Sequence, residues 1–347
     1  MPAPLKLGPD DRVLVFAPHP DDESIACGGL LLAARDLGIP RRVVVVTDGD
    51  NNPWPQRWIE KRWRIDAAAR ARWGARRRAE AWAALDVLGV DGDERFFLGL
   101  ADSELTDLLV SGSRLDSELA AHIERFRPTH IALPALEDRH PDHSAVHVAA
   151  RLAIARLAPP APSLLCFAVH GEKASEGAIA VTLNEAQQAA KREAILQHAT
   201  QMRLSGGRFL RFAREVENYA APTLVARADL PLRARFDAQG LELRIAKSEL
   251  RDAASALQLL VLVDDSDGER LRLRIPLAYG PLPAQNSARS GSDRVDFEWH
   301  AIGGEIALRL GLARPARNGF FKLERRRPGL VIYDRYGWQT AEFDAKT

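Results

Sequence analysis

The sequence contains only two cysteines among its 347 residues, Cys27 and Cys166, and they lie far apart in the chain. This scarcity excludes a framework of several disulfides and a cysteine-rich zinc module, and it suits a reducing compartment. No apolar run approaches the roughly 20 residues that a transmembrane helix needs. Near the N-terminus, the single early Lys6 and the charged run 10–12 interrupt the apolar stretch that a signal peptide requires. We therefore predict a soluble, cytoplasmic protein.

An excess of charge of either sign is also missing. The chain has 48 Lys and Arg residues against 47 Asp and Glu residues, a net charge of +1. Nothing in this balance calls for nucleic acid as a partner or for a membrane surface. The sequence also lacks a Gly-rich phosphate loop and a Gly-x-Ser-x-Gly nucleophile elbow. The length suffices for one large domain or two ordinary ones with a real core.

Apolar runs alternate with helical patterns from residue 13 to about residue 220. We expect strands at 13–16, 42–46, 95–98, 129–133 and 164–169, and helices near 28–37, 56–88, 114–126, from 142 and at 185–198. Near-continuous apolar strands separated by helices are typical of a parallel sheet that is covered on both faces. We predict a three-layer α/β domain with a mostly parallel sheet over residues 1–223.

A different pattern follows Pro222. Apolar and charged residues alternate around 241–245, 271–275 and 295–299, and Gly-containing turns separate these stretches at 264–268 and 303–304. Alternation with a period of two, interrupted by hairpin turns, is typical of an antiparallel β-sandwich. We expect this second domain to span residues 224–347, and its role stays open.

Two short runs rich in histidine and aspartate stand out. Pro18-His19-Pro20-Asp21-Asp22-Glu23 follows the first expected strand, and His140-Pro141-Asp142-His143 comes shortly after the strand at 129–133. Ligands of parallel α/β sheets bind beyond the carboxyl ends of the strands, so the two runs can converge on one metal ion. Any one aspartate alone could instead cap the helix that follows it.

The spacing favours His19, Asp22 and His143 as metal ligands. A catalytic zinc takes three nitrogen or oxygen ligands and keeps a position open for water. The absence of thiolate ligands places Zn²⁺ ahead of Mn²⁺ or Fe²⁺ without fixing the metal.

Three further residues of the two runs are candidates for catalysis. Asp21 can take a proton from water that the metal acidifies. His140 can stabilise an oxyanion, or protonate a leaving group if it is cationic. Asp142 can orient or tune one of the histidines.

The runs at 17–23 and 140–143, together with Thr47-Asp48-Gly49 and Arg77-x-x-Glu80, resemble the PIG-L/LmbE family of zinc-dependent N-acetylglucosamine de-N-acetylases. The resemblance covers about residues 10–220 and does not extend to the β-rich remainder. It implies a Rossmann-like fold and a metal held by the residues that match His19, Asp22 and His143. It also implies Asp21 as general base and His140 as electrostatic or acid partner. The implied substrate is an N-acetylated sugar or glycoconjugate, from which acetate is released.

Residues 51–80 combine nine Lys and Arg residues with four tryptophans, Trp54, Trp58, Trp63 and Trp73. One interpretation is a lid beside the site that binds substrate through Trp54, Arg57, Arg62 and Arg64. The simpler alternative is an amphipathic helix that buries its tryptophans and exposes a basic face.

Two other functions stay open at this point. The same scaffold could carry another metal hydrolase, such as a phosphoesterase that uses Asp21, Asp22 and a second metal. Alternatively, the β-sandwich could make the chain a non-catalytic carbohydrate-binding protein. The identity of the acetylated substrate and the oligomeric state, including a homo-oligomer, are not determined by the sequence.

Overall fold

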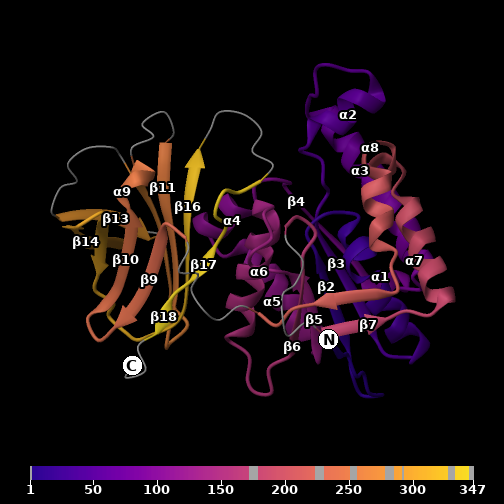
Figure 1. Ribbon diagram of the computed structural model, residues 1–347, viewed down its shortest axis with the longest axis horizontal. Helices are drawn as coiled ribbons and strands as arrows, with labels where there is room; N and C mark the ends of the chain where they lie inside the picture. The colour runs from indigo at the N-terminus through magenta and orange to yellow at the C-terminus, as the bar shows by residue number, and fades with distance from the viewer. Residues whose placement is uncertain are drawn as a thin grey trace.

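The computed structural model describes residues 2–171, 179–222, 230–250, 256–277, 285–290, 293–326 and 333–343. Its N-terminal part is built around a five-stranded sheet (Figure 1). The strands follow the order β4-β3-β2-β5-β6, and all neighbours are parallel. Their bounds are β2 (Val13–Ala17), β3 (Arg41–Thr47), β4 (Arg95–Leu100), β5 (His130–Pro134) and β6 (Ser163–Phe167). Because β2 neighbours both β3 and β5, the strand order reverses there, which is where such sheets bind ligands.

Helices cover both faces of this sheet. One face carries α1 (Asp22–Asp36), α3 (Ala67–Val87) and α7 (Glu185–Gln197), and the other carries α4 (Leu105–Ser111), α5 (Arg114–Phe126) and α6 (Pro141–Ile154). Alternate residues of β2 enter the two cores: Val13 and Val15 pack with α1, whereas Leu14 and Phe16 pack with α5 and α6. The predicted Rossmann-like three-layer fold is confirmed.

Two predicted helices have different bounds. The single helix expected over 56–88 is two helices, α2 (Pro53–Glu60) and α3, and a segment that is not helical separates them. Lys61 ends α2 in the left-handed conformation, and the Asp66 side chain caps α3 by accepting the Ala69 N–H at 2.8 Å. The first helix begins at Asp22, before the Gly28 that was expected, because its first turn is formed by the acidic run itself.

A three-stranded sheet lies beside α1. It has the order β1-β7-β8 and comprises β1 (Ala3–Pro4), β7 (Ile179–Thr182) and β8 (Val216–Tyr219). Glu217 of β8 accepts the backbone N–H groups of Gly29 and Leu30 and pairs with the buried Lys191. A Cβ at Gly29 would lie 2.7 Å from the Glu217 Cδ, so glycine is needed for this close approach. The chain between these strands contributes α8 (Ala199–Phe209) and a 3-10 turn at Leu210–Phe212, and another such turn, Gly92–Glu94, precedes β4.

The C-terminal part is a two-sheet β-sandwich, as the alternation predicted (Figure 1). One sheet has six strands, β13 (Gln285–Ser290), β14 (Asp293–Ile302), β15 (Glu305–Leu310), β10 (Gly240–Ala246), β9 (Leu232–Asp237) and β18 (Glu342–Phe343). The other has β12 (Arg270–Leu277), β11 (Ala256–Asp265), β16 (Ala316–Arg326) and β17 (Gln339–Thr340), and a short helix, α9 (Lys247–Leu250), follows β10. All pairings are antiparallel except that of β9 with β18. The boundary expected at 223/224 lies outside the described residues, so the division into two domains stays a proposal.

Strand β11 joins the two parts because both of its faces are buried. Leu259 and Val261 lie in the sandwich core, whereas Leu260 and Leu262 belong to the core formed by α4, α5 and α6. A strand that is covered on both sides reads as an unbroken apolar run, as residues 259–263 do. The sandwich is therefore packed on the α/β part through an apolar surface.

Charges on β12 surround this contact. Arg270 and Arg272 both pair with Asp116 of α5, which is 3% exposed. The Arg270 guanidinium also donates to the Leu152 carbonyl at 2.8 Å, and that of Arg272 donates to the Leu109 carbonyl at 3.1 Å. Breaking such buried pairs is costly, so they help to fix the orientation of the sandwich. Among the described residues, no helix has the length and hydropathy that crossing a bilayer requires.

Candidate metal and catalytic site

The turn between β2 and α1 brings His19 and Asp22 to the same side. The backbone N–H of His19 donates to the Asp22 carboxylate at 2.9 Å, which closes the turn. Asp21 adopts φ 143°, ψ −26°, an unusual backbone conformation for a residue with a side chain, and its N–H donates to Glu23 at 3.0 Å. Conformations of this kind cost about 1–3 kcal/mol and occur mainly where a site requires them.

Three donor atoms form a nearly equilateral triangle at the carboxyl ends of β2 and β5. His19 Nδ1 lies 3.4 Å from Asp22 Oδ2 and 3.3 Å from His143 Nε2, and His143 Nε2 lies 3.2 Å from Asp22 Oδ2. Ligands about 2.0–2.1 Å from a tetrahedral zinc are about 3.3–3.4 Å apart. The three predicted ligands therefore fit one small divalent cation and leave a position open.

The second nitrogen of each of these imidazoles faces a buried carboxylate. His143 Nδ1 lies 3.2 Å from Asp138, and His19 Nε2 lies 3.3 Å from Asp102 and 3.4 Å from Asp142. Carboxylates in this position orient metal-binding histidines and raise their basicity. His19 with Asp102 and Asp142 is itself a compact donor group, as is His19 with His140 and His143. The triangle that includes Asp22 remains our proposed ligand set, because it leaves the other carboxylates as supports of the two imidazoles.

The electrostatics of the triangle favour a positive charge at its centre. Burial opposes ionisation of Asp22, but the nearby His143 and His19 outweigh burial and hold the pKa of Asp22 well below its usual range. Burial likewise opposes protonation of His143, yet Asp138 and Asp22 raise its pKa to about 10. Carboxylates that stabilise a proton here also stabilise a metal cation in its place, and the two compete.

Asp21 lies beside the triangle and is held by Arg77. The guanidinium donates to the Asp21 carboxylate at 3.0 Å and to the carbonyls of Pro20 and Gly49 at 2.7 Å each. Burial raises the pKa of Asp21 to about 6, although the charge of Arg77 acts in the opposite direction. Gly49 has a positive φ, and a Cβ there would lie 1.8 Å from Arg77 Nη1, so this contact requires glycine.

His140 stands at the N-terminus of α6, and its ring centroid is 4.6 Å from that of His19. Its Nδ1 accepts the backbone N–H of Asp142 at 3.2 Å, which leaves the ring proton on Nε2. Burial and the neighbouring histidines His19, His143 and His170 lower the pKa of His140 well below its usual value. The structure thus presents His140 as a neutral hydrogen-bond donor, whereas the sequence allowed a cation.

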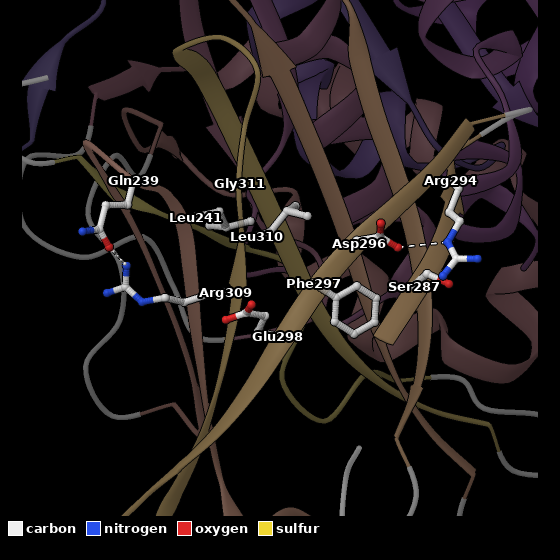
Figure 2. A pocket seen from close by; sticks show the side chains of 10 residues that line it. All are labelled: Gln239, Leu241, Ser287, Arg294, Asp296, Phe297, Glu298, Arg309, Leu310 and Gly311. Atoms are coloured by element: carbon white, nitrogen blue, oxygen red, sulfur yellow. Dashed lines mark hydrogen bonds and ion pairs between the residues drawn. The ribbon is translucent and has the colours of Figure 1, made fainter. Parts of the chain in front are cut away.

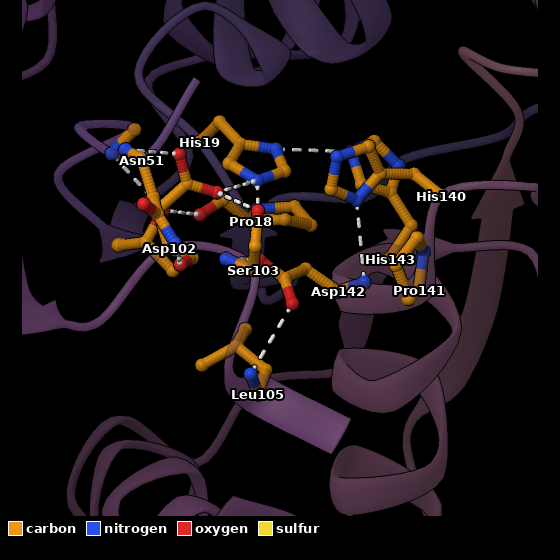
Figure 3. Close-up of polar contacts among 12 residues, drawn as sticks. Pro18, His19, Asn51, Asp102, Ser103, Leu105, His140, Pro141, Asp142 and His143 are labelled. Carbon is orange, nitrogen blue, oxygen red and sulfur yellow. Dashed lines mark hydrogen bonds and ion pairs between the residues drawn. The ribbon is translucent and has the colours of Figure 1, made fainter. Parts of the chain in front are cut away.

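Asp142 links two elements around the site. Its carboxylate accepts the N–H groups of Ser103 at 2.7 Å and Leu105 at 3.2 Å, at the start of α4 (Figure 3). Its position next to His19 fits the orienting role expected for it.

Sequence reasoning missed Asp102, Asp138 and His170. Asp102 follows β4, accepts the Asn51 N–H at 2.9 Å and faces His19. Asp138 follows β5 and accepts the N–H groups of His140, Val169 and His170. His170 follows β6, with its ring 5.0 Å from that of His143. Inspecting polar residues after every strand would have found all three.

The residues proposed to form a lid lie on and after α2. The exposed fractions of Trp54, Trp58 and Trp63 are 55%, 73% and 82%, whereas Trp73 is buried. The alternative of a helix that buries its tryptophans is therefore wrong for the first three. The Arg57 guanidinium lies 5.0 Å above the Trp54 ring, and Arg62 and Arg64 are exposed. Among the described residues, we find no hydrogen bond or ion pair between these side chains and the triangle, so their role in binding substrate stays a prediction.

A cavity of about 670 Å³ lies elsewhere, on the six-stranded sheet of the sandwich (Figure 2). Its arginines are already paired, Arg309 with Gln239 and Glu242, and Arg294 with Asp296. Its one aromatic residue, Phe297, is 3% exposed. Among the residues that the structure describes there, we find neither a cluster of catalytic groups nor an open ring for sugar stacking, and we do not place the active site in this cavity.

Comparison with known proteins gives one family match. Residues 14–154 match the family model described as PIG-L, GlcNAc-PI de-N-acetylase, which includes both clusters of the site. A search of curated proteins finds no match.

Solved structures resemble about three fifths of the chain. The conserved protein TT1542 from Thermus thermophilus is 24% identical (TM-score 0.46) and covers 63% of this chain and 98% of its own. N,N'-diacetylchitobiose deacetylase from Pyrococcus horikoshii is 20% identical (TM-score 0.47), covering 60% and 82%. The A40926 pseudoaglycone deacetylase Dbv21 is 21% identical (TM-score 0.48), covering 62% and 99%.

Proposed function

Because residues 14–154 form a domain of the PIG-L family, we propose that the protein is a zinc-dependent deacetylase of an N-acetylated sugar or glycoconjugate. The observation that carries the proposal is the triangle of His19, Asp22 and His143 donor atoms, with Asp21 beside it. When bound, a divalent cation supplies Lewis acidity to the acetamide carbonyl and to water.

The chain itself supplies the proton transfers. The Asp21 carboxylate, held by Arg77, accepts a proton from the attacking water. The Nε2–H of His140 donates a hydrogen bond to the oxyanion that develops from the acetamide carbonyl. The proton taken up by Asp21 then passes to the leaving nitrogen, so that acetate and a free amine are the products.

Substitution of the base tests this proposal. We expect Asp21→Asn to retain bound metal and to lose acetate release by a factor of about 10²–10⁴. Acetate would be assayed enzymatically on a panel of N-acetylhexosamine glycoconjugates, and metal content by elemental analysis. As a matched control, Asp36→Asn removes a carboxylate at the distant end of α1 and should keep wild-type activity. Wild-type rates in Asp21→Asn would contradict the role of Asp21.

Metal stoichiometry separates this function from a two-metal phosphoesterase. Within the part of the chain that the structure describes, the compact donor groups open to a second ion are His19 with Asp102 and Asp142 and His19 with His140 and His143, and both share His19 with the triangle. We expect one zinc per chain at saturation. Two ions per chain, with phosphate release from phosphate esters, would instead favour the phosphoesterase.

A further inference from the structure

The C-terminal part reaches the rim of the candidate active site through residues 333–341. The backbone N–H of Asp334 donates to the Arg139 carbonyl at 2.7 Å, immediately before His140. The Asp334 carboxylate pairs at 2.7 Å with Lys322 of β16, whose side chain is 0% exposed. Asp334 is therefore fixed to both parts of the molecule, and it determines the position of its neighbour Tyr333.

Tyr333 continues a row of rings that begins at the metal triangle. The His170 ring lies 5.0 Å from that of His143 and 5.5 Å from that of His140, between centroids. The Tyr333 ring lies 5.5 Å beyond His170, and its hydroxyl is 3.5 Å from His170 Nδ1. Since 40% of Tyr333 is exposed, part of this ring is open to a ligand next to the site.

Two exposed guanidinium groups border the same rim. The Arg139 Cζ lies 5.7 Å from the Tyr333 ring centroid, and Arg208 of α8 donates to His170 Nδ1 at 2.9 Å. Within the described part of the chain, neither arginine pairs with a carboxylate, unlike Arg77 and the β12 arginines. Guanidinium groups left without an acidic partner are well placed for bidentate binding of a phosphate or carboxylate.

We propose that Tyr333, His170, Arg139 and Arg208 form a substrate subsite that binds an anionic sugar unit next to the acetamide. The aromatic face of Tyr333 would pack against the sugar ring, and the two guanidinium groups would bind its phosphate or carboxylate. The choice of an N-acetylated sugar rests on the proposed function, whereas the preference for an anion rests on these residues alone. The C-terminal part is then a component of the active site.

Direct binding to the metal-free protein tests the subsite without catalysis. The probes are N-acetylglucosamine, its 1-phosphate and N-acetylmuramic acid, so the neutral sugar is compared with a phosphate and with a carboxylate. By calorimetry, we expect at least one anionic sugar to bind about tenfold more tightly than the neutral one. Equal affinities for the three sugars, or no binding of any, would overturn the proposal.

Substitutions assign the effect to residues. The double variant Arg139→Gln/Arg208→Gln should weaken binding of the anionic sugar about tenfold and leave the neutral sugar within about threefold of wild type. Arg203→Gln, an exposed arginine on the same helix as Arg208, is the matched control and should change neither. Wild-type affinity of the double variant for the anionic sugar would contradict the subsite.

Tyr333 is tested by two replacements. Tyr333→Phe keeps the ring and should preserve binding, whereas Tyr333→Ala should weaken all three sugars by a similar factor. Thermal unfolding and zinc content of Tyr333→Ala should match the wild type, which separates lost contact from lost folding. Unchanged affinity in Tyr333→Ala would remove Tyr333 from the subsite.

The two proposals fail in different ways. Selective binding of the anionic sugar without acetate release from the zinc-loaded wild-type protein would refute the deacetylase and retain the subsite. Acetate release with no preference for an anion would do the reverse.

Discussion

Two buried polar clusters of the α/β part differ in how their charges are balanced. In the cluster between α1, α7 and β8, the Lys191 ammonium faces the Glu217 carboxylate, which also accepts two backbone N–H groups and the Tyr219 hydroxyl at 2.9 Å. Every strong donor and acceptor there has a partner within the chain. This cluster is complete as it stands and needs nothing from outside.

Around the triangle of His19, Asp22 and His143, the charges are not balanced in this way. Five carboxylates meet there, and each is at most 6% exposed: Asp21, Asp22, Asp102, Asp138 and Asp142. Among the described residues, Arg77 is the one Lys or Arg that pairs with any of them. The remaining negative charge is offset by protons on the histidines, or by a cation bound in their place. The excess of carboxylates makes the triangle, rather than the cluster around Glu217, suited to binding a cation.

The largest effect is expected from removing a ligand. Loss of a carboxylate that supports a metal-binding histidine can cost roughly 100-fold in metal affinity. His143→Ala removes a proposed ligand itself, so its zinc affinity should fall by more than this, and it should release no acetate. Zinc content after dialysis and competition with a chelator measure the affinity. Chelation should lower the melting temperature of the wild type, because the metal binds only the folded state, and should leave that of His143→Ala unchanged.

Glu217→Gln is the control for this prediction, since it alters a buried carboxylate of the complete cluster. It should keep one zinc per folded chain. If His143→Ala retained wild-type zinc affinity, the triangle would not be the metal site, and the contrast between the clusters would fail.

The second prediction concerns the effect of Glu217→Gln on stability. Glu217→Gln leaves the Lys191 ammonium buried without its counter-charge and should lower the free energy of unfolding by about 3–5 kcal/mol. Denaturant-induced unfolding of the zinc-free protein measures it. The double variant Lys191→Met/Glu217→Gln removes both charges and should lose less than Glu217→Gln alone. A loss below about 1 kcal/mol in the single variant would mean that the ion pair is not the main support of this cluster.

Features of the fold and the site could be predicted from the sequence where they depend on residues close together in the chain. The strands of the α/β part and the two runs rich in histidine and aspartate, at the starts of α1 and α6, are local patterns. The sheet edge and the convergence of His19, Asp22 and His143 on it could therefore be predicted. The sandwich followed from alternation along single strands such as β10 and β14. The helix break at Lys61 was not visible, because one residue in the left-handed conformation leaves the helical periodicity almost unchanged.

The supporting residues were harder to predict because their partners are distant in the chain. Asp102 stands alone between β4 and α4, and only the parallel pairing of strands brings it to His19. Tyr333 lies outside residues 14–154, which match the family model, and it reaches the site because β11 and β16 pack on the α/β part. Contacts of this kind depend on how the sandwich packs on the α/β part, and the periodicity of a single segment does not predict that packing.

The smallest effect tests whether carboxylates around the triangle act through the histidines. Asp138→Asn keeps the shape of the side chain but removes the charge behind His143 Nδ1, at 3.2 Å. We expect the affinity for zinc to fall about 10–100-fold. At saturating zinc, the variant should still bind the metal and should release acetate at nearly the wild-type rate. Competition titration measures the affinity. If Glu217→Gln lost as much zinc affinity, any buried carboxylate would have this effect. A loss of zinc affinity confined to Asp138→Asn would instead show that the carboxylates at the triangle act through the histidines they contact.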